Sequence, residues 1–441
     1  MKPMLPVRCL LTLLVGLLPS AIAGQVWTVA ATTGPSARHT AAAIYDPVGE
    51  RIVLFGGRSA AGDHNDLWTF DLQSDDWRQL QPTGAAPMPR FSHNAVYDAL
   101  GQRMLIWSGR SLDAAGSTLL NDVWALDLRT EQWTQLLPTS AAPIARYGTA
   151  AVYDPIAMEL VSFAGFTTQG RFDDTWRFDP VGRIWRDVTL ASPQPGERCL
   201  HAAAYDSRRH RMIMFGGQRG NAALDDAWAL DLATDRWSVL PPAPATGGRK
   251  FAAVTYDPSG DRFLLFGGET TAGTRGGDLW ALDLASQQWS VLTTTGPAPR
   301  DGAVLLHVPG QSRLLLFGGT TPDGNAGDTW SLVLPGPPTV VYQQPSTLQP
   351  STQRAPLSLQ AYPNPFNGSV VLELQLTDAG HVTIHDMLGQ PVRHLGRARA
   401  GTSRRIWDGH DDGGTAVASG VYLAVLQDPS SRRVQRLMLL R

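Results

Sequence analysis

The feature that most constrains this chain is a tryptophan that returns at a nearly constant interval. Its six copies are separated by 56, 52, 52, 52 and 50 residues, and an aspartate stands two positions before each copy. A unit of this length that recurs along a chain is one supersecondary structure, and its copies bury a common core by packing against one another. The six tryptophans are Trp68, Trp124, Trp176, Trp228, Trp280 and Trp330.

Three further elements recur in the same order within each unit. An aromatic–small–glycine triplet lies upstream of the tryptophan, a tyrosine lies ten residues before the triplet, and an arginine lies seven residues before the tyrosine. In the sixth unit His307 takes the place of the tyrosine. The short apolar runs between these elements suit four β-strands per unit, which we name a to d. The repeat arginines are Arg38, Arg90, Arg146, Arg198, Arg249 and Arg300.

The two ends of the repeat array are complementary. A second tryptophan opens strand d in the first five units, but the sixth unit has Thr339 at that position, within a proline-rich stretch. Trp27 stands alone before the first unit and precedes Arg38 by 11 residues, the same interval that separates Trp289 from Arg300. The N-terminal strand is therefore predicted to supply strand d of the last unit, which closes a ring within residues 24–335 and removes its exposed edges.

The order of these motifs resembles the kelch repeat of the galactose oxidase/kelch superfamily. The resemblance implies an all-β fold, a six-bladed kelch β-propeller closed by its N-terminal strand. Ser108 and Ala164 replace the first glycine of the triplet in the second and third units. Galactose oxidase itself needs a tyrosine crosslinked to a cysteine and further tyrosine and histidine ligands. No matching set surrounds Cys199, and we predict no metal and no cofactor.

Loop lengths single out one face of the propeller. From the triplet aromatic to the aspartate, the b–c connection spans 11 to 15 residues, and the d–a connection spans 11 to 13, whereas the other spacings are constant. Because strands within a blade are antiparallel, b–c and d–a connections emerge on the same face. Loops that vary on a constant scaffold commonly bind ligands. We therefore place binding on this b–c/d–a face, where residues 110–120 form the longest loop.

Arginines provide the candidate binding groups on that face. A ring of guanidinium groups can hold a carboxylate or an acidic sugar through paired hydrogen bonds. The alternative is that an arginine repeated in every blade is a scaffold element that pairs with backbone or aspartate. The candidate ligand-binding residues are Arg38, Arg90, Arg146, Arg198, Arg249, Arg300 and Arg110.

The N-terminus has the pattern of a signal peptide over residues 1–23. Lys2 and Arg8 precede an apolar run at residues 9–18, and Ala21-Ile22-Ala23 matches a small-x-small cleavage site before Gly24. No other apolar segment is long enough to suggest a membrane span. Charged residues make up 17 % of the chain and the formal net charge is −2, so we predict no nucleic-acid partner.

The C-terminal part forms a second unit. Residues 336–356 are rich in Pro, Gln, Ser and Thr and are predicted to be a linker, and alternating strands over 357–441 predict a small Ig-like β-sandwich. This unit resembles the FlgD-like immunoglobulin fold and the type IX secretion (Por) C-terminal sorting domain. Tyr-Pro-Asn-Pro-Phe-Asn at 362–367, Trp-Asp-Gly at 407–409 and Ser-Gly-Val-Tyr at 419–422 carry the match. The resemblance implies a secretion machinery as partner and a secreted or outer cell-surface location.

Three functions remain open at this stage. The favoured hypothesis is a binding or interaction protein, rather than an enzyme, that takes a glycan or protein ligand on the b–c/d–a face. One alternative is a sugar-active enzyme such as a sialic-acid-type mutarotase, and another is a purely structural surface protein. A repeat scaffold leaves specificity to its loops, so the sequence does not name the ligand.

Overall fold

The computed structural model describes residues 26–99, 101–114, 116–190, 193–243, 247–334, 358–362, 368–376, 379–386, 390–399, 401–427 and 432–439. Nearly all regular structure in these residues is β-strand, and the one helical element among them is a 3-10 turn, η1, at Pro309–Gln311. The all-β prediction is therefore confirmed. The predicted signal peptide (1–23) and linker (336–356) lie outside the described residues.

Six antiparallel four-stranded sheets lie between residues 28 and 333 of the described chain, and each corresponds to one sequence unit. The first three are β2 (Ala42–Asp46), β3 (Arg51–Phe55), β6 (Leu67–Asp71) and β7 (Trp77–Leu80); β8 (Asn94–Asp98), β9 (Arg103–Trp107), β12 (Val123–Asp127) and β13 (Gln132–Gln135); and β14 (Ala150–Asp154), β15 (Glu159–Thr167), β16 (Gly170–Asp179) and β17 (Ile184–Asp187).

The remaining three sheets repeat the same order of strands. They are β18 (Ala202–Asp206), β19 (Arg211–Phe215), β22 (Ala227–Asp231) and β23 (Arg236–Leu240); β24 (Ala253–Asp257), β25 (Arg262–Phe266), β26 (Leu279–Asp283) and β27 (Gln288–Thr293); and β28 (Val304–Val308), β29 (Arg313–Phe317), β32 (Thr329–Val333) and β1 (Thr28–Ala31).

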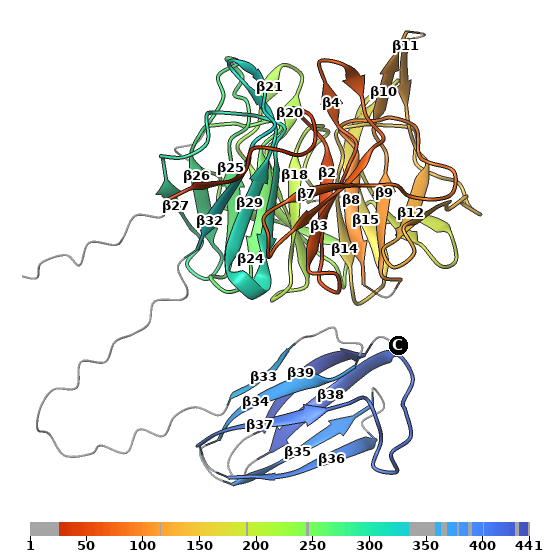
Figure 1. The fold of residues 1–441 in the computed structure, drawn as a ribbon, viewed down its shortest axis with the longest axis vertical. Helices are drawn as coiled ribbons and strands as arrows, with labels where there is room; N and C mark the ends of the chain where they lie inside the picture. The colour runs from red at the N-terminus through yellow and green to blue at the C-terminus, as the bar shows by residue number, and fades with distance from the viewer. Residues whose placement is uncertain are drawn as a thin grey trace, which may run out of the picture.

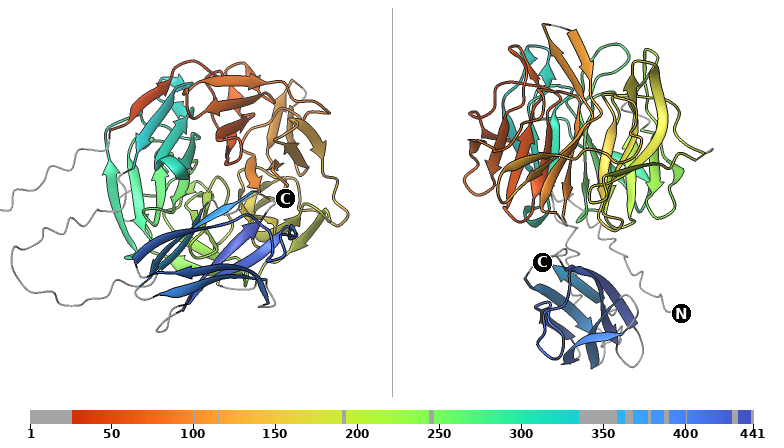
Figure 2. Two further views of the ribbon diagram at one scale, coloured as in Figure 1. Left: turned by 60° about the horizontal axis from the view of Figure 1, so that its bottom comes forward. Right: turned by 90° about the vertical axis from the view of Figure 1, so that its right-hand side faces the viewer.

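The sheets stand around a common axis (Figures 1 and 2). Their first strands neighbour one another in the cyclic order β2, β8, β14, β18, β24, β28 and back to β2. These strands are rich in alanine, and their residues line a central cavity. Small side chains suit this position because the strands crowd toward the axis.

The N-terminal segment enters the last sheet as its fourth strand. β1 pairs with β32 antiparallel, with Thr28 opposite Ser331. The adjacent Trp27 is only 5 % exposed, and its ring lies 5.8 Å from that of Phe266. Every other second tryptophan likewise packs on the triplet aromatic of the preceding sheet, with ring centroids 4.5 to 5.7 Å apart. These aromatic contacts belong to the apolar packing between neighbouring sheets.

A ring of backbone hydrogen bonds joins the six sheets where the first strands begin. The residue two positions after each repeat arginine has a φ between 50° and 64°. Its N–H donates to the equivalent carbonyl of the preceding sheet, over 2.6 to 3.1 Å, and Thr40 donates to Gly302 to complete the cycle. The ring consists of Thr40, Ser92, Gly148, Leu200, Phe251 and Gly302. We call this ring the throat.

Small hairpins extend the b–c connections beyond the main sheets, at the top of Figure 1. The third sheet has no separate hairpin because β15 and β16 themselves continue into the turn. The longest separate hairpin corresponds to the predicted long loop and pairs Arg110 with Leu119. The hairpins are β4 (Arg58–Ser59) with β5 (Gly62–Asp63), β10 (Arg110–Asp113) with β11 (Gly116–Leu119), β20 (Gln218–Arg219) with β21 (Ala222–Ala223), and β30 (Thr320–Thr321) with β31 (Gly324–Asn325).

The described part of the C-terminal unit consists of two antiparallel sheets that share one core. Trp407, Ile384 and Leu426 are fully buried between them. One sheet contains β33 (Ser358–Tyr362), β34 (Val370–Leu376) and β37 (Gly401–Trp407), and the other contains β36 (Pro391–Ala398), β35 (Gly380–His385), β38 (Gly420–Gln427) and β39 (Arg432–Leu439).

Candidate functional site

The repeat arginines lie inside the fold. Arg90 is fully buried, and its guanidinium donates to both carboxylate oxygens of Asp122 at 2.7 and 2.8 Å. It also donates to the carbonyls of Met88 and Ser108, each at 3.1 Å. The same carboxylate accepts the indole N–H of Trp124 at 2.6 Å. The recurring Arg, triplet and Asp-x-Trp motifs are thus parts of one hydrogen-bonded unit, which we call the Arg–Asp–Trp module.

The module recurs in every sheet with small variation. Five of the arginines bind both oxygens of their aspartate over 2.6 to 3.1 Å, whereas Arg249 approaches Asp278 only to 3.7 Å. All six donate to a carbonyl of the triplet over 2.9 to 3.1 Å. Since none of the six is more than 7 % exposed, this geometry corresponds to the scaffold alternative and does not present the groups to a ligand.

The modules hold their carboxylates in the charged form. Burial raises the pKa of an aspartate, but hydrogen bonds and the charge of the arginine outweigh it, and the pKa values of four of these groups lie below the ordinary value. A charged pair with both partners hydrogen-bonded avoids the penalty of an isolated buried charge. The four aspartates are Asp66, Asp122, Asp226 and Asp328.

Directly above the throat, each sheet presents two positions whose residues differ from sheet to sheet. The residue after the repeat arginine forms an isolated β-bridge with the third residue after the triplet aromatic. These residues surround the axis on the b–c/d–a face, and we call them the funnel. The pairs are His39 with Arg58, Phe91 with Arg110, Tyr147 with Phe166, Cys199 with Gln218, Lys250 with Glu269, and Asp301 with Thr320.

The first three sheets contribute a row of alternating aromatic and cationic groups to the funnel. The guanidinium of Arg58 lies 5.4 Å from the ring centroid of Phe91, and that of Arg110 lies 6.0 Å from the same ring. Arg110 also lies 5.6 Å from the ring of Tyr147, which packs 5.6 Å from that of Phe166. Arg171 lies 5.4 Å from the Phe166 ring. These distances permit cation–π attraction, which stabilises both the rings and the guanidinium groups.

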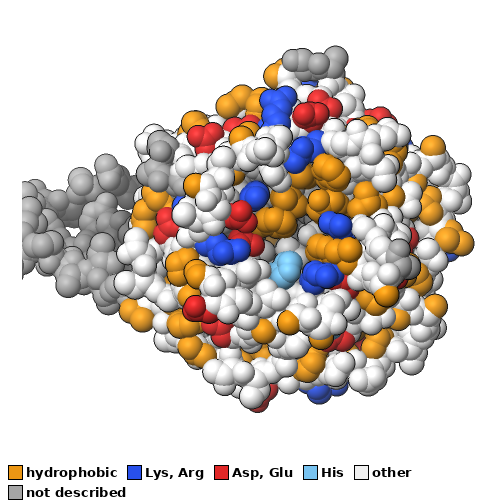
Figure 3. Space-filling view, turned by 90° about the horizontal axis from the view of Figure 1, so that it is seen from above, with side chains coloured by type: hydrophobic (Ala, Val, Ile, Leu, Met, Phe, Trp, Pro, Cys, Tyr) orange, Lys and Arg blue, Asp and Glu red, His pale blue; other side chains and the backbone are white. Residues whose placement is uncertain are grey.

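Arg110 is the one predicted ligand-binding arginine that reaches this row. Its side chain is half-buried, and its Nε donates to Ser117 within the same hairpin at 2.8 Å. Asp63 anchors the hairpin from the neighbouring sheet, because its carboxylate pairs with Arg58 and accepts the N–H of Leu112. Seen from above, basic and hydrophobic side chains gather around a central hollow (Figure 3).

The other half of the funnel is polar and internally paired. Lys250 lies 3.2 Å from Glu269, and Arg275 forms an ion pair with Asp301. Cys199 is buried, and burial raises the pKa of its thiol. The funnel is therefore asymmetric, with its aromatic and cationic groups concentrated on the first three sheets. Sequence reasoning missed Phe91, Tyr147 and Phe166, although their signal was present: each stands at a position that changes within an otherwise constant motif.

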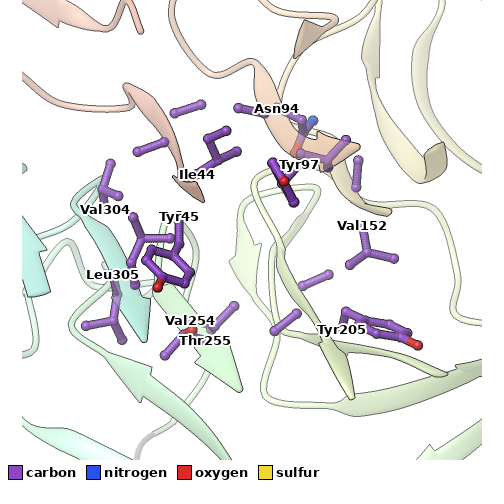
Figure 4. A pocket seen from close by; sticks show the side chains of 18 of the residues that line it. Ile44, Tyr45, Asn94, Tyr97, Val152, Tyr205, Val254, Thr255, Val304 and Leu305 are labelled. Atoms are coloured by element: carbon purple, nitrogen blue, oxygen red, sulfur yellow. The ribbon is translucent and has the colours of Figure 1, made fainter. Parts of the chain in front are cut away.

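A cavity of about 1410 Å³ lies along the axis below the funnel. Its upper lining is the throat, and none of the twelve funnel residues contributes to it. Below the throat its walls are the first strands of the six sheets (Figure 4). Residues of the a–b turns such as Val48 and Pro155 also line the cavity, and so do Ala361 and Tyr362 of the C-terminal unit. The axis thus carries two separate surfaces, the funnel above the throat and the chamber below it.

Comparison with known proteins identifies the family. The model of the KLHDC2/KLHL20/DRC7 kelch-repeats domain matches residues 21–204, 99–250 and 210–358, which together span well over half of the chain. This chain therefore belongs to the kelch-repeat family, and its repeats form a β-propeller fold. A solved structure described as "Structure of YjhT" superimposes with a TM-score of 0.55 at 16 % identity, covering 68 % of this chain and 96 % of the other. That likeness concerns the fold.

Curated relatives share the kelch region. Kelch domain-containing protein 3 of Homo sapiens is 25 % identical over 338 residues, which cover 70 % of this chain and 84 % of the relative. The leucine-zipper-like transcriptional regulator 1 homolog of Drosophila melanogaster is 27 % identical over 66 % of this chain, and the acyl-CoA-binding domain-containing protein 4 of Arabidopsis thaliana is 26 % identical over 81 %. The chain spans only 30 % and 53 % of these two relatives.

The described residues contain no helix that is long and apolar enough to cross a membrane.

Proposed function

We propose that this chain is an interaction protein that binds a protein or glycan ligand in the funnel, on the b–c/d–a face. The observation that carries the proposal is the row of Arg58, Phe91, Arg110 and Tyr147. Its guanidinium groups sit on aromatic faces at the open end of the axis. Aromatic and arginine side chains contribute most of the binding energy at protein interfaces. Kelch domains generally bind protein partners, which supports the same class of function.

The row favours a ligand that offers both a flat apolar group and a negative charge. Phe91 and Tyr147 give apolar area, and Arg110 keeps N–H groups available beyond its bond to Ser117. A carboxylate that replaces water on this guanidinium forms charge-assisted hydrogen bonds. The repeat arginines do not take part, because their N–H groups are used within the modules.

We also propose that the six sheets are the blades of a closed propeller that spans residues 24–335. The pairing of β1 with β32 supports the proposal. So do the unbroken throat of six hydrogen bonds and the packing of Trp27 on Phe266, which places the N-terminal strand in phase with strand d of the other blades.

The proposed location is outside the cell or on its outer surface. The basic–apolar–small pattern of residues 1–23 supports export, and the motifs of residues 357–441 support a sorting role, with residues 336–356 as the linker. A comparison of the mature N-terminus and of the medium, surface and cell fractions tests this proposal. Retention of residues 1–23 on a cytosolic chain would contradict it.

The binding proposal is tested by saturation-transfer NMR on the full chain. The probes are pooled neutral sugars, pooled acidic sugars and an acidic peptide that contains aromatic residues. We expect transfer to an acidic probe, and the Arg110→Ala variant to weaken binding by roughly 3- to 30-fold, the range for loss of a cation–π contact. Arg129→Ala is the matched control, because Arg129 is 65 % exposed on the c–d turn at the opposite end of the same sheet.

The same spectra separate binding from catalysis. Faster exchange between the anomers of a sugar would favour the mutarotase alternative, since a binding module produces transfer without turnover. If Arg110→Ala and Arg129→Ala bind every probe like the unmodified chain, the funnel is not the binding site.

A further inference from the structure

We propose that the chamber below the throat is a second binding site, for the end of a neutral oligosaccharide. The chamber is separate from the funnel, so this inference does not rest on the proposed function. The chamber has a volume of about 1410 Å³. Pockets for single small ligands measure about 300–1,000 Å³, so the chamber has room for more than one sugar ring.

The chamber wall carries very few charged groups. Among the described propeller residues that line it there is no lysine or arginine, and Glu50, at the lower end, is the only carboxylate. Two histidines line the upper end, His93 and His201, and both are uncharged at neutral pH. Burial, assisted by the charge of the adjacent repeat arginine, lowers the pKa of each to about 3. A charged ligand would lose its hydration here without meeting an opposite charge.

Three tyrosines supply polar groups to the lower part of the wall. Tyr45, Tyr97 and Tyr205 are half-buried at the lower ends of β2, β8 and β18, and Figure 4 shows their rings around the cavity. Within the described structure their hydroxyls have no hydrogen-bond partner in the protein. The tyrosines of the third and fifth sheets differ: Tyr153 is buried and donates to Asp98 at 2.6 Å, and Tyr256 donates to Asp261 at 3.0 Å.

The three unpaired phenols remain protonated donors. Burial, together with nearby carboxylates, raises the pKa of each. Each hydroxyl therefore offers one donor and two acceptor sites, and each ring offers an apolar face. A sugar ring matches this combination, because it presents C–H faces and neutral hydroxyls together. A purely apolar chain would leave three phenols unpaired, at a cost for each one.

Alanines of the first strands form much of the upper wall. Polar side chains such as His93, Asn94 and Thr149 interrupt this apolar surface, and the three phenols add hydroxyl groups at the lower ends of the strands. The ligand is therefore expected to enter from the lower end, with its terminal sugar in the alanine-lined part and the next sugars beside the phenols. The throat residues mark the upper limit of the chamber lining, and the funnel residues lie beyond them.

The test is isothermal titration of the full chain with four probes: maltotetraose, cellotetraose, chitotetraose and, as the charged counterpart, tetragalacturonate. We expect at least one neutral probe to bind and tetragalacturonate not to compete with it. The triple variant Tyr45→Phe/Tyr97→Phe/Tyr205→Phe keeps the rings and removes only the hydroxyls. It should weaken that binding by roughly fivefold per hydroxyl, about a hundredfold in total.

Controls separate this site from the funnel and from misfolding. Arg110→Ala lies above the throat and should leave tetrasaccharide binding unchanged. An unchanged thermal transition of the triple variant establishes that it folds. Absence of binding by all three neutral probes overturns the inference, and so does equal binding of tetragalacturonate. Loss of tetrasaccharide binding in Arg110→Ala but not in the tyrosine variant would assign the sugar to the funnel, which refutes the chamber site while the proposed function stands.

Discussion

The Arg–Asp–Trp module gives the sharpest prediction about stability. Replacing Arg90 with alanine removes a fully buried guanidinium that binds one carboxylate twice and two backbone carbonyls once each. Asp122 is left without its cation, and the carbonyls of Met88 and Ser108 lose a donor. The module joins the start of strand a, the end of strand b and the start of strand c, so the substitution loosens three strands of one sheet.

The size of the effect follows from these contacts. Breaking one side of a buried ion pair costs about 3–5 kcal/mol. Each carbonyl left without a donor costs about 1 kcal/mol more. The carboxylate of Asp122 is 20 % exposed and keeps the indole N–H of Trp124, so water relieves part of the penalty. We therefore expect a loss of about 4 kcal/mol, a large share of the roughly 5–15 kcal/mol that stabilises a typical domain.

Urea unfolding followed by tryptophan fluorescence measures this loss, because the indoles lie between the sheets. Arg110→Ala is the control: it also removes an arginine on the same face, but a half-buried one, and should change the unfolding free energy by less than about 1 kcal/mol. Arg90→Lys keeps the charge without the paired geometry and should lie between the two. A loss below about 1 kcal/mol for Arg90→Ala would refute the assignment of the repeat arginines to the scaffold.

Two further predictions concern closure and acid stability. Trp27→Ala should destabilise the propeller by about 3–5 kcal/mol because it empties a buried aromatic site. Val29→Ala, at a position 49 % exposed, should have little effect on the thermal transition. Similar transitions for both variants would contradict the proposed closing role of the N-terminal strand. Stability should also fall below about pH 4, because the module aspartates have a lower pKa in the folded chain than in the unfolded chain. The stability that they contribute above the unfolded pKa is lost as the pH falls through the folded pKa. Urea unfolding midpoints between pH 7 and 3 measure this loss. The Arg90→Ala variant should lose less stability over that range, because its Asp122 no longer has a cation that favours the charged form. An equal or steeper loss in the variant would contradict the assignment of the lowered aspartate pKa values to the module. The aspartates concerned are Asp66, Asp122, Asp226 and Asp328.

Spacing in the sequence was sufficient to place the strands. The second tryptophan was predicted to begin strand d in the first five units, and β7 of the first sheet begins at Trp77. The lone Trp27 pointed to a strand that pairs in the last unit, and β1 pairs with β32. These inferences succeeded because a propeller repeats local strand and turn geometry, which a period of about fifty residues records directly.

The same pattern did not show whether the repeat arginines point into the fold or into solvent. Arg90 and Asp122 are 32 residues apart in the chain, and either could have faced solvent as a polar residue beside a loop. Only the register of strands a, b and c brings them together and covers them. Repetition of a charged residue therefore indicated a constraint on the fold, while the residues one position later, such as Phe91 and Tyr147, faced the open funnel.

By itself, the sequence determined that the chain is an all-β repeat protein of the kelch type, because strand length, turn residues and interval are local properties. Only the tertiary structure decided which charged groups are buried and paired and which aromatic rings reach the funnel. It also decided which phenols of the chamber have no hydrogen-bond partner among the described residues. Those outcomes depend on how six sheets crowd around one axis, and side chains at the same position in each repeat then meet different neighbours.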